Sequence, residues 1–243
     1  MNKAQNRPTL HKVLSMILAL VMVLSLLPMS GFTSDVQTAS ESGSDSTEFM
    51  RIFHLDCGRK YFTVAQIEAL IDTAAENNYT HVELAFGNNG LRFLLKEMSV
   101  TVGDKTYSSD EVTEGIQQGN KNYYNNAGTN ELTESEMNDI ITYADSKGIG
   151  IIPLLNSPGH MDAIIDCMEY LSMSNVAFSA TKYGTSARTI DLTNDQAVAF
   201  TKAFVQKYVD YFKGKGCQYF NIGADEYAND ILIRDCQKTF AAA

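Results

Sequence analysis

Residues 148–160, with the sequence GIGIIPLLNSPGH, carry the strongest fold signal in the chain. Gly148 ends a helical pattern, and the run from Ile149 to Leu155 is apolar throughout. Such a run is typical of a parallel strand that is buried on both faces. Polar residues begin directly after it, at Asn156, and extend to His160. The stretch therefore predicts an internal strand of a parallel sheet with polar groups at its carboxyl end.

Strand and helix patterns alternate on both sides of this strand. Short β-type runs occupy 51–56, 80–86 and 218–222, and helical spacings occupy 63–77, 133–147 and about 195–212. Thr133 with Glu136, and Thr193 with Gln196, have the spacing of capping boxes that begin the last two helices. The alternation predicts a parallel sheet with right-handed crossovers, and on pattern alone an open doubly wound sheet is also allowed.

Polar side chains follow each of the four predicted strands: Asp56 and Arg59, Asn88 and Asn89, Asn156 and His160, and Asp225 and Glu226. Ligands of parallel α/β proteins bind at the carboxyl ends of the strands. We therefore expect one site that is built from four loops. The polar stretch 87–130 is too long for an ordinary connection, and it predicts a functional insertion.

Composition excludes several classes of protein and of site. The chain has 243 residues and a formal net charge of −10, which argues against nucleic acid as a partner. Its four Cys do not have metal-type spacing, and we assign them no function. Only four His are present, and we expect neither a metal site nor a cofactor.

The amino-terminal residues have the pattern of an export signal. Three cations (Lys3, Arg7 and Lys12) precede an apolar run, which predicts a signal peptide over 1–34; an uncleaved membrane anchor is the alternative. Residues 35–48 are rich in Ser, Thr, Asp and Gly, and they predict a disordered linker.

The strand-end segments resemble the catalytic domain of glycoside hydrolase family 20, the β-N-acetylhexosaminidases. Three segments carry the resemblance: LDCGRKYF (55–62), NSPGH (156–160) and GADE (223–226). Three others, GNNGLRF (87–93), HMDA (160–163) and DEYAND (225–230), are most similar to surface exo-β-N-acetylglucosaminidases of streptococci and related Gram-positive bacteria. The resemblance implies a (β/α)₈ barrel that acts on terminal N-acetylhexosamine glycans.

The adjacent carboxylates Asp225 and Glu226 favour one mechanism over another. Ordinary retaining glycosidases place two carboxyls about 5–5.5 Å apart across the scissile bond, whereas neighbouring residues start on different sides of the backbone. Such a pair fits a substrate that supplies its own nucleophile. The resemblance implies that Glu226 is the general acid and base, and that Asp225 orients the 2-acetamido group and stabilises the positively charged intermediate.

The resemblance also implies substrate-binding residues. Arg59 would hold hydroxyls of the terminal sugar, with a surface salt bridge as the alternative, and His160 would tune protonation, with a core or capping role as the alternative. Asn88, Asn89 and Arg92 either line the sugar pocket or close a turn. Many family members have Asp where this chain has Asn156, so the role of that residue is open. Two further features favour structural roles: Asp191 precedes a helix cap, and Tyr123-Tyr124 fits packing better than a sugar platform.

The length predicts half a barrel. A complete (β/α)₈ barrel takes about 250 residues, and we identify four strands within 49–243. We therefore expect the amino-terminal half of the catalytic domain. The chain contains no Trp, and the family takes its aromatic pocket walls from later strands. Two functions follow: an exported hydrolase that removes terminal β-linked GlcNAc or GalNAc, secreted or at the cell surface, or a catalytically inactive half barrel that binds carbohydrate or another surface partner.

Overall fold

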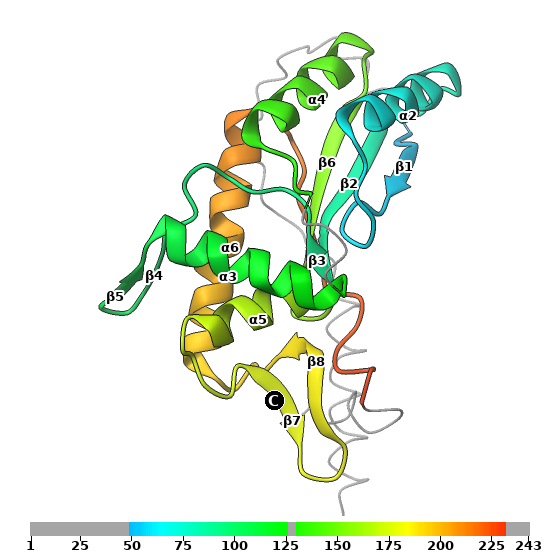
Figure 1. Cartoon of the computed structure of the whole chain (residues 1–243). Coiled ribbons are helices and arrows are strands. Elements are labelled where there is room, and N and C mark those ends of the chain that lie inside the picture. The colour runs from blue at the N-terminus through cyan, green and yellow to red at the C-terminus, as the bar shows by residue number, and fades with distance from the viewer. Residues whose placement is uncertain (1–48, 126–129, 232–243) are drawn as a thin grey trace, which may run out of the picture. The chain divides into compact units, whose positions relative to one another are not determined.

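The computed structural model describes residues 49–125 and 130–231. The predicted signal peptide and linker lie outside the described residues. Within the described part, four parallel strands form the main sheet in the order β1 (Ile52–Leu55), β2 (His81–Asn88), β6 (Gly150–Ser157) and β9 (Asn221–Gly223) (Figure 1). This sequential parallel order confirms the predicted α/β fold, and it is the arrangement of four consecutive strands of a (β/α)₈ barrel.

The internal position of β6 is confirmed. It pairs with β2 on one side and with β9 on the other, and His81 lies opposite Gly150 in the ladder. The last strand is shorter than the predicted 218–222, because β9 pairs with β6 only from Asn221 onward. Strands β1 and β9 are edges of the described sheet, and their outward residues Ile52 and Ile222 are 45% and 51% exposed.

Three long helices connect the strands: α2 (Val64–Glu76), α4 (Glu134–Ser146) and α6 (Asp195–Gly214). The capping box of Thr133 and Glu136 is confirmed. The predicted box at Thr193 is wrong, because Asn194 is the N-cap of α6 and accepts from the N–H groups of Gln196 and Ala197. Thr193 instead donates its hydroxyl to Asp191 at 2.7 Å.

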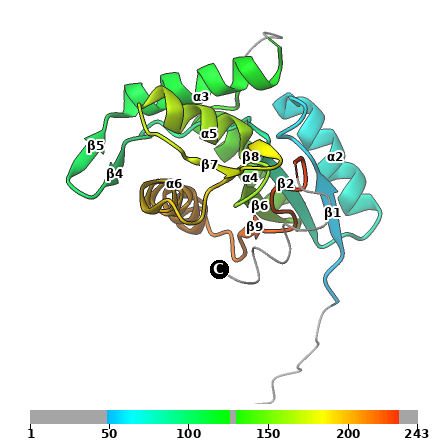
Figure 2. The ribbon, with the colours of Figure 1, turned by 90° about the horizontal axis from the view of Figure 1, so that it is seen from below.

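The stretch 87–130 contains regular structure that its polar composition conceals. It forms β3 (Gly90–Leu91), the hairpin β4 (Val100–Val102) and β5 (Lys105–Tyr107), and helix α3 (Ser109–Tyr123), which begins with a capping box at Ser108. Helix α5 (Asp162–Tyr170) lies beside α3 in both views (Figures 1 and 2). The two backbones approach so closely that a Cβ at Gly119 would overlap the Ala163 carbonyl.

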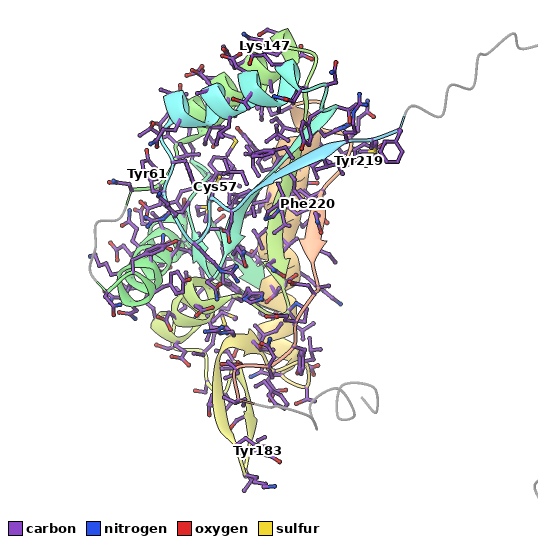
Figure 3. The ribbon with its side chains drawn as sticks, turned by 90° about the vertical axis from the view of Figure 1, so that its right-hand side faces the viewer. Cys57, Tyr61, Lys147, Tyr183, Tyr219 and Phe220 are labelled. Atoms are coloured by element: carbon purple, nitrogen blue, oxygen red, sulfur yellow. The ribbon has the colours of Figure 1, made fainter. Side chains whose placement is uncertain are left out.

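A second hairpin, β7 (Ala177–Ala180) and β8 (Gly184–Ile190), follows α5. Its tip carries Tyr183 and points away from the sheet (Figure 3). In Figure 1 the carboxyl ends of the main strands point toward α3, α5 and this hairpin. These elements therefore stand where the predicted site is expected.

An aromatic cluster joins the sheet to α6. Phe86 of β2 contacts Phe93, Tyr208 and Phe212 with ring centroids 5.1–5.6 Å apart. The buried Tyr208 hydroxyl donates to the Phe93 carbonyl at 2.9 Å, so this polar atom is satisfied. Three cysteines, Cys57, Cys167 and Cys217, are free thiols, and Cys236 lies outside the described residues. In the described part, no helix is long and apolar enough to cross a membrane.

Candidate active site

A cavity of about 270 Å³ lies at the carboxyl ends of the four strands. Its lining comes from all four strand ends: His54, Asp56, Arg59, Asn88, Leu154, Asn156, Asn221, Gly223 and Asp225. A larger cavity of about 580 Å³ lies at the amino ends of β2 and β6, beside residues 141–151 and 215–219. We place the site in the smaller cavity, because it alone of these two is lined by a member of the carboxylate pair.

Arg59 has protein partners on all three of its guanidinium nitrogens. Its Nε donates to Asn89 Oδ1 at 2.9 Å, and its Nη1 donates to Asp56 Oδ2 at 3.2 Å. Its Nη2 lies 3.3 Å from His160 Nδ1. A guanidinium has five N–H donors, so two remain for a ligand after these three contacts. The side chain is 47% exposed, and Arg59 lines the cavity.

His160 connects Arg59 to the predicted acid. Its Nε2 lies 2.7 Å from Glu226 Oε2, and the imidazole is 5% exposed. The backbone makes this approach possible, because a Cβ at Gly159 would overlap the Glu226 carbonyl oxygen. Position 159 therefore has room only for glycine, and the imidazole of the next residue, His160, points toward Glu226.

The side chain that contacts Asp225 is not the one that contacts Glu226. Asn156 donates from Nδ2 to Asp225 Oδ1 at 3.0 Å and accepts from the Ala224 N–H at 3.3 Å. Burial acts to raise the pKa of Asp225, but the hydrogen bond from Asn156 and the nearby His160 and Arg59 outweigh it, so the pKa lies below the ordinary value. Asp225 is therefore a carboxylate at neutral pH.

Asn89 links three parts of the site. Its φ of 65° places it in the left-handed region, and its backbone N–H donates to the His160 carbonyl at 2.6 Å. Its side chain accepts from Arg59 and donates to Asp162 Oδ2 at 2.6 Å. Burial raises the pKa of Asp162, against the opposing effect of the Asn89 hydrogen bond. Neighbouring Asn88 donates to Asp56 Oδ2 at 3.0 Å, and its own Oδ1 is buried without a hydrogen-bond partner.

The structure does not bring Arg92 to the cavity. Its side chain is buried under the ring of Tyr124, 3.5 Å from the ring centroid, and donates to the Asn130 carbonyl at 3.0 Å. Tyr124 also donates its hydroxyl to the Gly58 carbonyl. These contacts fix the insertion against the β1 loop, so Tyr124 has the packing role that we expected. Arg92 thereby supports the loop that carries Arg59.

Several contacts near the cavity were not predicted from the sequence. His54 and Glu83 pair at 2.6 Å, and Asn221 donates to the second oxygen of Glu83 at 2.7 Å. The available signal was period-two spacing, which places His54 of β1 on the same side of the chain as Asp56, the residue directly after the strand. Asp230 was also missed; it accepts from Ser186 Oγ at 2.8 Å and ties the residues after Glu226 to β8.

Metal ligands do not gather at this site. Over residues 49–125 and 130–231, no three His, Cys, Asp or Glu side chains are placed together to hold a metal ion.

Comparison with known proteins gives the family. The model of the catalytic domain of glycosyl hydrolase family 20 matches residues 49–241, which is most of the chain. The chain belongs to glycosyl hydrolase family 20. The expected family is therefore confirmed, and with it the barrel-type fold.

Solved structures of family 20 proteins resemble the chain closely. A catalytic module of the pneumococcal exo-β-D-N-acetylglucosaminidase StrH is 43% identical with a TM-score of 0.75, over 79% of this chain and 46% of that one. A second StrH structure is 46% identical with a TM-score of 0.71, over 75% of this chain and 44% of that one. The chain thus spans less than half the length of these relatives.

A curated relative from another genus matches a shorter region. Lacto-N-biosidase of Bifidobacterium bifidum is 33% identical over 96 residues, which are 39% of this chain and 8% of that protein.

Proposed function

We propose that the site binds the terminal β-linked GlcNAc or GalNAc of a glycan and hydrolyses its glycosidic bond with retention, using the substrate's acetamido group as the nucleophile. Glu226 protonates the leaving oxygen and then activates water. Asp225 orients the acetamido group and stabilises the positive charge of the cyclic intermediate. Arg59 holds hydroxyls of the terminal sugar, with Asn88 and Asn89 beside it.

The observation that carries this proposal is the separate anchoring of the two adjacent carboxylates. Asp225 accepts from Asn156, whereas Glu226 contacts His160. A lowered pKa keeps Asp225 ionised, as charge stabilisation requires. Glu226 is 42% exposed and is held at one oxygen by His160, which leaves it access to a leaving group.

The donors of Arg59 support the substrate class. Two free N–H groups on neighbouring guanidinium nitrogens match a pair of adjacent hydroxyls, the pattern of a sugar ring. The relatives agree with this, because StrH is described as a pneumococcal exo-β-D-N-acetylglucosaminidase. That protein and the basic, apolar amino terminus of this chain support export, to the medium or to the surface of a Gram-positive cell.

The test is hydrolysis of p-nitrophenyl β-N-acetylglucosaminide and its galactosaminide counterpart by the purified chain. We expect release of p-nitrophenol that Glu226→Gln abolishes and that Glu76→Gln, an exposed control on α2, leaves unchanged. No release above the Glu226→Gln background contradicts hydrolysis by this chain. Sugar binding without release supports the other candidate, an inactive carbohydrate-binding half barrel.

A further inference from the structure

The imidazole of His160 lies between a group that can only donate hydrogen bonds and one that accepts them. Arg59 Nη2 stands 3.3 Å from Nδ1, and Glu226 Oε2 stands 2.7 Å from Nε2. A guanidinium has no acceptor and keeps its proton in proteins. The Nδ1 atom that faces it must therefore present its lone pair, and the ring proton must lie on Nε2.

Arg59 is itself fixed in this position. Its Nε donates to Asn89 and its Nη1 donates to Asp56, so the guanidinium plane is held at two further points. The backbone of His160 is fixed from the same side, because its carbonyl accepts from the Asn89 N–H at 2.6 Å. The contact between Nη2 and Nδ1 is therefore imposed by the surrounding hydrogen bonds on both partners.

We propose that Arg59 is a positioning residue that selects the protonation form of His160. By donating to Nδ1 it holds the neutral tautomer with hydrogen on Nε2, and this hydrogen is donated to the Glu226 carboxylate. The imidazolium form would point an N–H at the guanidinium and place two cations side by side.

The carboxylates around the ring favour the imidazolium over the neutral tautomer. Removal of Arg59 should therefore change the protonation form of the ring by a measurable amount. Asp225 and Asp162 both interact with His160, and Glu226 contacts it directly. These three carboxylates favour the imidazolium, and Arg59 is the cation that faces the ring nitrogen. Without the guanidinium, the three carboxylates would favour uptake of a proton from water at Nδ1.

Within the proposed function, on which this step rests, the arrangement couples sugar binding to acid chemistry. In the free site Glu226 accepts from the Nε2–H group of His160. Sugar hydroxyls that draw the Nη2 donor away from Nδ1 relieve the restriction on the ring. The ring can then take a proton from water on Nδ1 and pass its Nε2 proton to Glu226, which leaves a neutral Nδ1–H ring that accepts at Nε2 from protonated Glu226, the acid form.

The test is ¹H–¹⁵N correlation of the imidazole nitrogens in the full chain at neutral pH, with His160 assigned by its absence in His160→Gln. We expect the pattern of the Nε2–H tautomer in the unchanged chain. In Arg59→Met this form falls from the major species to a minor one and the imidazolium pattern replaces it. Arg188→Met is the matched control, because Arg188 lies near Asp162 but pairs with Asp230.

Two results overturn the proposal. One is an Nδ1–H or imidazolium pattern in the unchanged chain, a measurement that does not depend on the folding of any variant. The other is an Nε2–H pattern that persists in folded Arg59→Met, or that is lost equally in Arg188→Met. Addition of GlcNAc separates this inference from the proposed function: if no signal of the chain shifts, sugar binding fails while the tautomer result stands.

Discussion

Asn156 and Asp225 form a matched pair in which the amide of Asn156 donates to the carboxylate at 3.0 Å and its oxygen accepts from the backbone N–H of the preceding residue, Ala224, at 3.3 Å. The amide therefore has a defined orientation, with its donor toward the charge and its acceptor toward an N–H. A carboxylate at position 156 could satisfy the second contact but would repel Asp225. The pair explains how this chain keeps Asp225 ionised with Asn at a position where many family members have Asp.

Asn156→Asp tests this account. We expect the pKa of Asp225 to rise above its value in the unchanged chain, because a donor is replaced by a second carboxylate at the same distance. The substitution should cost about 1–2 kcal/mol at pH 7, where both groups are charged, and less near pH 4, where one of them is protonated. Side-chain carboxyl NMR titration and thermal unfolding at the two pH values check this. An unchanged Asp225 titration contradicts the assigned role of Asn156.

Gly159→Ala tests the close approach of the two loops that carry His160 and Glu226. A new Cβ would overlap the Glu226 carbonyl, so we expect a loss of about 1–3 kcal/mol in the free energy of unfolding and a displaced Glu226. The matched control is Gly214→Ala, where no atom lies within 4 Å of the new Cβ and the residue is helical. That control should be neutral or more stable by up to about 1 kcal/mol. Urea unfolding measures both, and equal stabilities would refute the steric argument.

The strand ends could be predicted because the sequence marks them twice, first by an apolar run and then by a polar pair. The order of these pairs along the chain predicted one site at the strand ends. In the structure Arg59 and Asp225 line the same cavity, and His160 contacts Arg59. The sequence could not show in the same way which of the two adjacent Asn side chains contacts both Arg59 and Asp162. Asn88 and Asn89 are chemically identical, and only the left-handed backbone of Asn89 turns its amide toward both Arg59 and Asp162.

Helices α3 and α5 and the hairpin β7–β8 were not predicted from the sequence, each for a different physical reason. Helix α5 begins at Asp162, and its N-cap Met161 makes no side-chain cap hydrogen bond, so no capping signal precedes the helix. Helix α3 buries Val112 and Ile116 beside Gly115 and Gly119, and small residues on its buried face kept the apolar periodicity weak. The hairpin β7–β8 is polar and short, and contacts with residues far along the chain, such as Thr189 with Ala228, hold it in place.

The raised pKa of Asp162 predicts a pH dependence of stability. A carboxyl whose folded pKa lies above its unfolded value binds more protons in the folded state, so its contribution is lost as pH rises through that window. Asp162→Asn removes this contribution while an amide oxygen can still accept from Asn89. We expect the variant to gain stability relative to the unchanged chain between pH 3 and pH 7. Chemical unfolding across this range measures the gain, with Asp210→Asn on the exposed face of α6 as the control. A constant difference between variant and parent would contradict it.

Thr189→Val tests the connection between hairpin β7–β8 and the residues after Glu226. The Thr189 hydroxyl accepts from the Ala228 N–H at 2.9 Å in a buried setting. Valine has the same shape without the acceptor and leaves the amide unsatisfied, so we expect a loss of about 1–3 kcal/mol. Hydrogen exchange of the Ala228 amide should accelerate in proportion. Thr185→Val, on the exposed part of the same strand, should change neither quantity by much. Equal exchange rates for Ala228 in the two variants would show that the hairpin does not hold the carboxylate pair in place.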